Sequence, residues 1–265
     1  MTAMTATIKT ADSLLRQTVA QHPAAGHALF AVLNQARPTV DQAGSFLRNY
    51  DAHASHLRRL LLKAATIMPE KAVGFILENV RNEYGNGNVD GRHQLQLQDL
   101  AWQIGLSRAA YNGFAVQPGI RRFIKDVTPY YYPLGKFAAA NKVKETRTFT
   151  GTGTETEIGG KTSRPIRSRA AVAAGAITAT ELMAVEEFKS MQKAFCSFGL
   201  EHHIWFDHVT IECEHLEDSV NLALFFLDEN PAFADDVLFG LKGVLDANMH
   251  LYDGLLACID NSLDG

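Results

Sequence analysis

The chain has 265 residues, a formal net charge of −4, 46% hydrophobic residues and 20% charged residues, which is typical of a globular protein. The acidic balance gives no reason to expect nucleic-acid binding, and no Lys/Arg-rich run suggests an anionic membrane surface. The start, "MTAMTATIKTADSLL", lacks the pattern of a signal peptide, and no apolar run reaches the roughly 18 residues of a membrane span. The three cysteines lack zinc-finger spacing and favour a reducing compartment, so we expect a cytoplasmic protein without nucleic-acid or membrane partners.

Most of the chain has the apolar spacing of helices, with hydrophobic residues at i, i+3, i+4 and i+7. The predicted helices cover residues 24–36, 40–67, 69–83, 93–106, 168–198, 202–229 and 233–263. The stretch 128–143 is interpreted as a turn that leads into one further helix. No internal repeat or convincing strand pattern is present. We therefore predict an all-α bundle of seven or eight helices, which forms a single domain over residues 1–265 with an N-terminal extension at 1–20.

One segment departs from the helical pattern. Residues 145–165 are rich in Thr and Gly and almost devoid of large apolar side chains. Such a composition predicts a mobile insertion. Two interpretations remain open: a lid that orders over bound substrate, or a passive surface insertion.

The stretch "HVTIECEH" is the strongest indication of a functional site. His208, Glu212 and His215 stand at i, i+4 and i+7, which places them within roughly 60° of arc on one helix face. A solvated helix face is the alternative interpretation. However, Trp205 and Phe206 begin a largely apolar neighbourhood, and buried imidazole and carboxylate groups require a partner. A metal ion is the partner that both groups share, and the spacing suits two ions with Glu212 between them.

A two-metal site requires further ligands, preferably carboxylates. Glu83 lies at the predicted end of one helix and His93 near the start of the next. The Gly/Asn-rich loop between them allows both to point at one place, although an ordinary surface loop is the alternative. Glu181 stands in an otherwise small and apolar run, where an isolated carboxylate is costly unless a ligand compensates it. Glu186 and Glu187 are followed by lysines and are interpreted as a solvated face.

Taken together, these residues resemble the heme-oxygenase-like diiron oxidases and oxygenases. The resemblance covers roughly residues 24–260 and rests on the order of the motifs, including the small-residue run "AAGAITATE" and the "WFDH" that precedes the ligand helix. It implies a heme-oxygenase-like helical bundle, the fold group of thiaminase II and pyrroloquinoline-quinone synthase C. The metal ligands that it implies are Glu83, His93, Glu181, His208, Glu212 and His215. Glu212 departs from the pattern, since Asp is commoner there.

The resemblance implies two Fe(II) ions per chain, with O2 as co-substrate, and no catalytic residue beyond the metal ligands. It further implies a small amine, amino-acid or fatty-acid substrate that undergoes N-oxygenation or oxidative C–C or C–N cleavage in specialised metabolism. The alternative is a cofactor-free or single-metal helical ligand-binding protein or enzyme of the thiaminase II-like fold, without redox chemistry. The sequence leaves a homodimer open.

Other metal and catalytic motifs lack support. A ferritin-like diiron bundle requires two Glu-x-x-His pairs, and only Glu212–His215 qualifies. There is no His-Glu-x-x-His, Gly-x-Ser-x-Gly or P-loop pattern. Four further histidines are interpreted as structural or surface residues: His53, His56, His202 and His203.

Overall fold

A computed structural model describes residues 2–132 and 167–259, with side chains from residue 10 onward except at 208 and 210–215. The predicted insertion at 145–165 and its role as a lid therefore lie outside the described residues. The described part of the chain contains ten α-helices and no strand. They are α1 (Thr2–Ala20), α2 (Ala28–Leu33), α3 (Val40–Ala65), α4 (Glu70–Glu83), α5 (His93–Gln103), α6 (Arg108–Gly113), α7 (Pro118–Tyr131), α9 (Arg169–Phe195), α10 (His208–Glu229) and α11 (Ala234–Leu256).

The expected all-α class is confirmed, whereas the expected number of seven or eight helices is too low. Three described helices were not predicted, namely α1, α6 and α7, and residues 128–131 form the last turn of α7 instead of an isolated turn. The signals of α6 and α7 are present in the sequence. Ser107 caps the first turn of α6, and Pro118 occupies the start of α7, where its missing N–H is not needed. In addition, Ile120, Phe123 and Val127 form a buried helical stripe.

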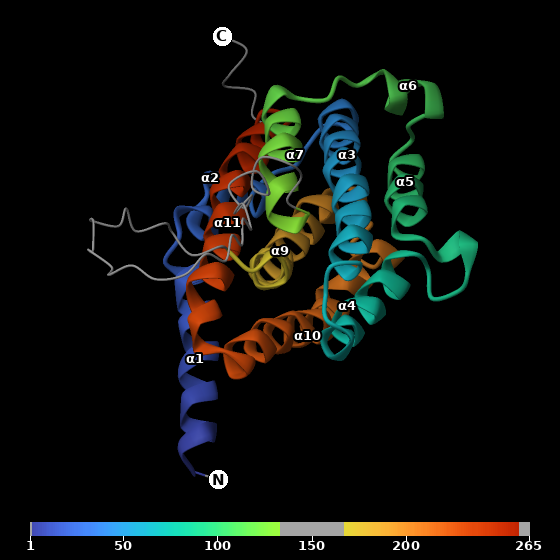
Figure 1. The fold of residues 1–265 in the computed structure, drawn as a ribbon. Helices are drawn as coiled ribbons and strands as arrows, with labels where there is room; N and C mark the ends of the chain where they lie inside the picture. Colours follow the sequence, from blue (N-terminus) through green and yellow to red (C-terminus); the bar gives the residue numbers. More distant parts are fainter. Residues whose placement is uncertain (1, 133–166, 260–265) are drawn as a thin grey trace, which may run out of the picture.

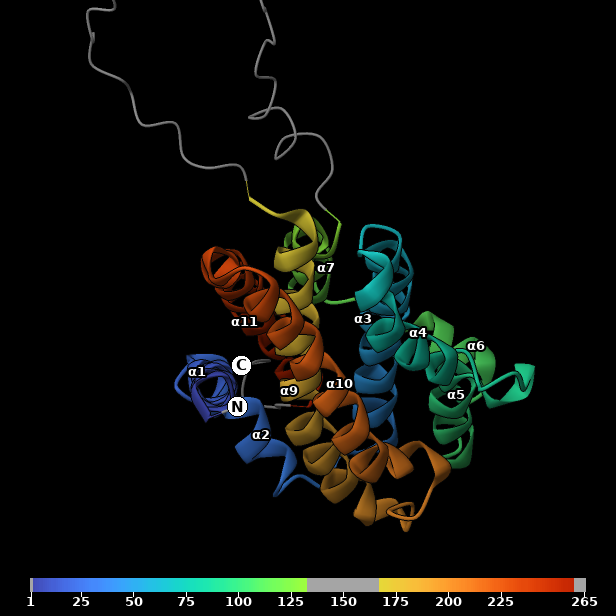
Figure 2. The ribbon, with the colours of Figure 1, turned by 60° about the horizontal axis from the view of Figure 1, so that its bottom comes forward.

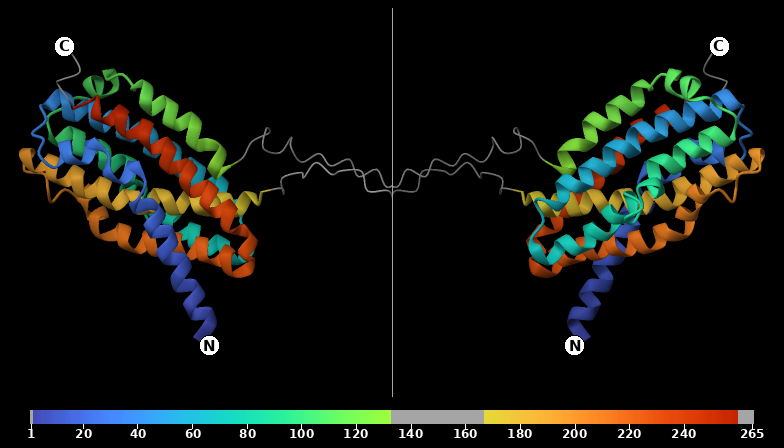
Figure 3. Two further views of the ribbon diagram at one scale, coloured as in Figure 1. Left: turned by 90° about the vertical axis from the view of Figure 1, so that its left-hand side faces the viewer. Right: turned by 90° about the vertical axis from the view of Figure 1, so that its right-hand side faces the viewer.

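The helix predicted at 24–36 is also shorter than expected. A 3-10 turn, Pro23–Gly26, precedes α2, because the backbone of His27 is extended and its Nδ1 accepts a hydrogen bond from the N–H of Leu29. The N-terminal residues form α1, which projects from the bundle in Figures 1 and 3. Its C-terminal half packs against the core through Leu15 and Val19.

Helix α9 lies at the centre of the bundle, with α11 and α10 packed along it and α7 against its N-terminal half (Figure 2). The small residues of "AAVAAGAITAT" make this close packing possible. A Cβ atom at Gly175 of α9 would overlap the backbone carbonyl of Val237 on α11, and one at Gly240 of α11 would overlap the carbonyl of Val172 on α9. The two glycines thus fix the spacing between α9 and α11.

The bundle is completed by α3, which packs against α4, α5 and α7. Side chains from the facing sides of α9 and α3 line the interior of the bundle. No helix among residues 2–132 and 167–259 is both long enough and apolar enough to cross a membrane.

The glycine contact between α9 and α11 gives a prediction. Replacing Gly240 with Ala should lower the free energy of unfolding by about 2–3 kcal/mol, because the added methyl group meets backbone and not a movable side chain. Gly74 in α4 is the matched control, since a Cβ there meets nothing within 4 Å. Gly74→Ala should raise stability by about 0.5–1 kcal/mol through helix propensity. Denaturant unfolding measures both, and equal effects of the two substitutions would contradict the close approach.

Candidate metal centre and adjoining cavity

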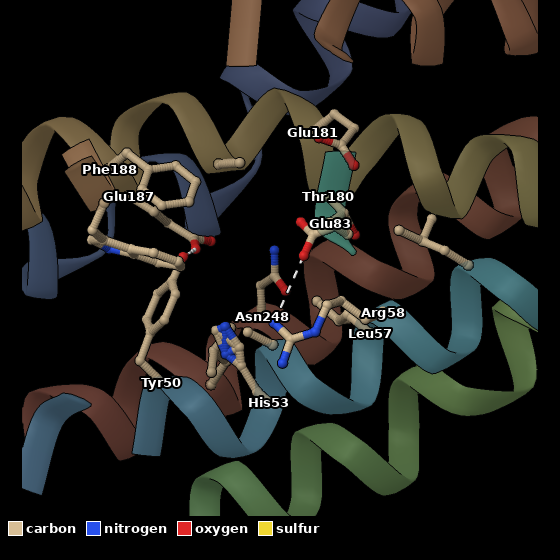
Figure 4. A pocket seen from close by; sticks show the side chains of 15 residues that line it. Tyr50, His53, Leu57, Arg58, Glu83, Thr180, Glu181, Glu187, Phe188 and Asn248 are labelled. Atoms are coloured by element: carbon tan, nitrogen blue, oxygen red, sulfur yellow. Dashed lines mark hydrogen bonds and ion pairs between the residues drawn. The ribbon is translucent and has the colours of Figure 1, made fainter. Parts of the chain in front are cut away.

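A cavity, termed the central cavity below, lies between α3, α9 and α11 and reaches the C-terminal end of α4 (Figure 4). Its described lining contains three carboxylates, from Glu83, Glu181 and Glu187, and one guanidinium, from Arg58. Buried charges of one sign are costly unless an opposite charge compensates them. The acidic excess therefore makes the cavity suitable for a cation.

Glu83 and His93 meet at the edge of this cavity. The loop between α4 and α5 has positive φ angles at Gly85, Asn86 and Gly87, so the chain reverses within a few residues. As a result, Glu83, the last residue of α4, and His93, the first residue of α5, face each other with 3.2 Å between Oε1 and Nδ1. The His93 side chain is 6% exposed, and that of Glu83 is 21% exposed. The loop thus brings a carboxylate and an imidazole together, as the sequence analysis expected.

Glu181 projects from α9 towards α4. The Nδ2 atom of Asn79, one turn before Glu83 on α4, donates a hydrogen bond of 2.8 Å to Oε1 of Glu181. Glu181 is buried, and both it and Glu83 line the central cavity, where Figure 4 shows their carboxylates near each other. Carboxylates from α4 and α9 are thereby held on one side of the cavity.

The interpretation of Glu187 as part of a solvated face is wrong. Glu187 is buried, and its carboxylate accepts hydrogen bonds from Tyr50 Oη (3.0 Å) and Tyr252 Oη (2.6 Å). Burial raises the pKa of the Glu187 carboxyl above its ordinary value, although the two hydrogen bonds act in the opposite direction. The sequence signal was the buried stripe that Glu187 shares with Met183 and Met191. The lysines at 189 and 193 lie on another side of α9.

The predicted ligands His208, Glu212 and His215 belong to α10, whose backbone is helical from its first residue. Their side chains lie outside the described part of the structure. Their helical positions nevertheless fall on the same face as Ser219, Leu222 and Phe226, which are all buried. On the opposite face, Glu217 is exposed and pairs with Arg16 of α1.

This face of α10 packs against α9. Thr178 of α9 donates a hydrogen bond of 2.8 Å to the carbonyl oxygen of Ser219. Since α10 also packs against α4, the helix that carries positions 208–215 contacts both helices that carry Glu83 and Glu181. The register of α10 is therefore compatible with the predicted ligand face.

The donor chemistry of the described residues fits iron. Carboxylate and imidazole groups are the ligands that non-heme iron uses, and Glu83, His93 and Glu181 supply both kinds. Within residues 10–132 and the described side chains of 167–259, no three His, Cys, Asp or Glu side chains are close enough together to hold a metal ion by themselves. A complete site thus requires further ligands, and α10 positions 208, 212 and 215 are the predicted source.

Several residues of the central cavity were not predicted as functional. His53 and Arg58 project from α3, and Asn248 projects from α11. His53 was interpreted as structural or superficial, but it is 2% exposed and lines the cavity. The signal was its position on the helical stripe that contains Tyr50, Leu57 and Leu61. By contrast, His203 has a structural role, since it hydrogen-bonds Asp99 and caps the backbone N–H of Trp205.

The chain belongs to the family of iron-containing redox enzymes, whose model matches residues 45–249. Its fold is similar to that of a CADD-like protein of unknown function from Nostoc punctiforme PCC 73102. One crystal structure of that protein has a TM-score of 0.67 at 14% identity, covering 96% of this chain and 99% of that chain. A second has a TM-score of 0.61 at 13% identity and covers 95% of each. No curated protein matches the sequence significantly.

The family confirms the resemblance that the sequence motifs indicated, at the level of an iron-containing redox enzyme with a heme-oxygenase-like fold. The similarity to the Nostoc protein covers nearly the whole of both chains but concerns the fold alone.

The buried imidazole of His53 gives a prediction on pH. Burial first, and then the positive charges of Arg58 and His56, lower the pKa of His53 to about 3 from an ordinary 6.5. In the unfolded chain His53 therefore becomes protonated as the pH falls below about 6.5, whereas in the folded chain it stays neutral until the pH approaches 3. The stability that neutral His53 allows is complete above pH 6.5 and is lost as the pH falls towards 3.

Between pH 7 and pH 5 this difference should cost the protein about 2 kcal/mol. A His53→Gln variant lacks the titrating group, so its free energy of unfolding should fall less than that of the wild type over this interval. Chemical denaturation at both pH values provides the measurement, with His202→Gln as an exposed-histidine control. If the free energy of unfolding falls equally for the wild type and His53→Gln between pH 7 and pH 5, the lowered pKa of His53 is ruled out.

Proposed function

We propose that the protein is an O2-activating non-heme diiron oxidase or oxygenase acting on a small molecule. The observation that carries the proposal is the acidic excess on one side of the central cavity, where the carboxylates of Glu83 and Glu181 face the single guanidinium of Arg58, next to His93. Such an excess in a buried site calls for added positive charge. Membership in a family of iron-containing redox enzymes supports iron as its source.

The proposed ligands come from four helices. Glu83 at the end of α4, His93 at the start of α5 and Glu181 on α9 would bind from the described side of the site. His208, Glu212 and His215 would complete it from α10. Two Fe(II) ions bound by this set would supply the electrons that activate O2. Glu212, which stands between the two histidines along the helix, would be the carboxylate ligand from α10.

The residues around the site have their own tasks. Asn79 orients the Glu181 carboxylate through its 2.8 Å hydrogen bond, and such an outer partner usually strengthens metal binding. Trp205 and Phe188 cover the cavity with aromatic surface, their ring centroids 5.3 Å apart. Apolar cover excludes water from the site, which protects reactive oxygen chemistry from side reactions. The substrate would be an amine, amino acid or fatty acid, and the reaction N-oxygenation or oxidative C–C or C–N cleavage.

Iron loading tests this proposal. The protein, loaded with Fe(II) without O2 and then desalted, should hold about two irons per chain. Exposure to O2 should then produce a transient visible absorbance. Iron near zero, or iron that does not respond to O2, would contradict the diiron proposal and favour a helical binding protein of the same fold without redox chemistry.

Ligand variants sharpen the test. Glu181→Ala and His215→Ala should each lower iron affinity at least tenfold, since removing even an outer partner of a ligand commonly costs that much. Their thermal unfolding should change little, because clustered carboxylates repel one another until a cation arrives. Glu186→Ala, on the same helix as Glu181, and the exposed His202→Ala are the matched controls. Full iron binding by either ligand variant would remove that residue from the set.

A further inference from the structure

Arg58 presents a nearly buried guanidinium group to the central cavity. Its side chain is 8% exposed, yet in the described part of the structure its guanidinium makes one hydrogen bond, from Nη2 to Ser55 Oγ at 2.8 Å. Among the described side chains, the nearest carboxylate oxygen is Glu83 Oε2, which lies 3.7 Å from Nη1, beyond hydrogen-bond distance. A guanidinium has five N–H donors in a planar fork. Most of this hydrogen-bonding capacity therefore faces the cavity.

Two neighbouring side chains present polar groups to the same region. His53, five residues earlier on α3, is 2% exposed, and its Nδ1 has no hydrogen-bond partner in the described structure. Asn248 of α11 is 3% exposed and lines the cavity opposite α3, and its amide makes a long 3.4 Å contact with Tyr252 Oη. Figure 4 shows Arg58, His53 and Asn248 projecting into the cavity from α3 and α11. Buried polar groups of this kind require a partner.

The remaining lining limits what that partner can be. Apolar side chains contribute most of the other described surface: Ala54, Leu57, Leu61, Ala184, Phe188 and Leu251. The planar fork of Arg58 matches a carboxylate or a phosphate group. The carboxylates of Glu83, Glu181 and Glu187 line the same cavity and would repel a doubly charged phosphate more strongly than a singly charged carboxylate.

We propose that Arg58, assisted by His53 and Asn248, binds the carboxylate group of the substrate, whose apolar body lies along the Leu57 and Leu61 side of α3. The substrate class is thus a small monocarboxylate, not a simple amine. This inference rests on the proposed function, because it places the substrate beside a metal held by Glu83.

Metal binding and carboxylate binding should strengthen each other. Without metal, Glu83 is the nearest counter-charge of Arg58. A metal ion that binds Glu83 engages that carboxylate, so Arg58 is left to pair with another anion. A carboxylate bound to Arg58 in turn offsets the positive charge of the metal. By linkage, each ligand must raise the affinity of the other by the same factor.

Titration calorimetry on protein loaded with Zn(II), which is redox-inert, tests the inference without turnover. The probes are hexanoate, its neutral analogue hexanamide, hexylamine and inorganic phosphate. Hexanoate should bind at least tenfold more tightly than each of the others, the loss expected when a charge-assisted pair is removed. Its affinity should be lower in the metal-free protein.

Arg58→Gln should lower the affinity for hexanoate at least tenfold. Arg58→Lys keeps the charge but loses the planar fork, so its affinity should lie between those of the wild type and Arg58→Gln. Arg59→Gln, an exposed arginine one residue further on α3, is the matched control and should bind hexanoate like the wild type. The preference of the wild type for hexanoate over hexanamide tests the inference even if Arg58→Gln does not fold.

Two results would overturn the inference. Unchanged hexanoate affinity in Arg58→Gln, together with tighter Zn(II) binding, would make Arg58 a counter-ion of Glu83 only. Stronger binding of hexylamine or phosphate than of hexanoate by the wild type would exclude a monocarboxylate site. The Zn(II) titration that precedes the probes reports on the metal site separately, so failure of the proposed metal centre is distinguished from failure of the carboxylate site.

Discussion

Acidic side chains are buried on α9, the central helix of the bundle, where an unpartnered carboxylate is costly. Glu181 and Glu187 project from α9 into an interior built mainly of apolar residues. Each is accommodated differently: Asn79 donates a hydrogen bond to Glu181, whereas two tyrosines donate to Glu187. The tyrosine pair satisfies both oxygens of Glu187 without any cation. On the other side of the cavity, Glu83 lies 3.7 Å from the guanidinium of Arg58, so a positive charge accompanies the carboxylates there.

The packing of α9 makes this arrangement possible. Its N-terminal half consists almost entirely of small residues, so α11 approaches closely, and the glycine and carbonyl contacts between α9 and α11 fix the spacing of these two helices. Beyond Thr178 the side chains become larger and polar groups enter the interior. The tightly packed half thus serves as a rigid support, and the half with Glu181 and Glu187 surrounds the cavity. A rigid scaffold around a chemically costly site is what a metal-binding bundle requires.

The sequence predicted those parts of the site that depend on local geometry. The loop between Glu83 and His93 reverses as its Gly and Asn residues require, and Glu181 is buried as its apolar neighbours indicated. The ligand face of α10 could be defined only as a set of helical positions. Glu187 was misjudged because nearby lysines were weighed in place of the residues one turn away.

Residues that depend on tertiary contacts could not be found in this way. The helical stripe of α3 indicates that His53 is buried, but no periodicity in α3 specifies that Arg58 and His53 face α9 and α11 across a cavity. The helices α6 and α7 differ in this respect, since their capping residues and the apolar stripe of α7 are local signals. Local sequence signals thus account for the helices, whereas the side chains that meet in the central cavity depend on how the helices pack.

The most direct test of the account is anomalous diffraction at the iron absorption edge from crystals of the Fe(II)-loaded protein. Two iron peaks are expected between α4, α5, α9 and α10, roughly 3.5–4 Å apart. Glu83, His93 and Glu181 should be bonded to them from one side, and His208, Glu212 and His215 from the other. Iron peaks elsewhere in the molecule, or a cavity without iron at full loading, would contradict it.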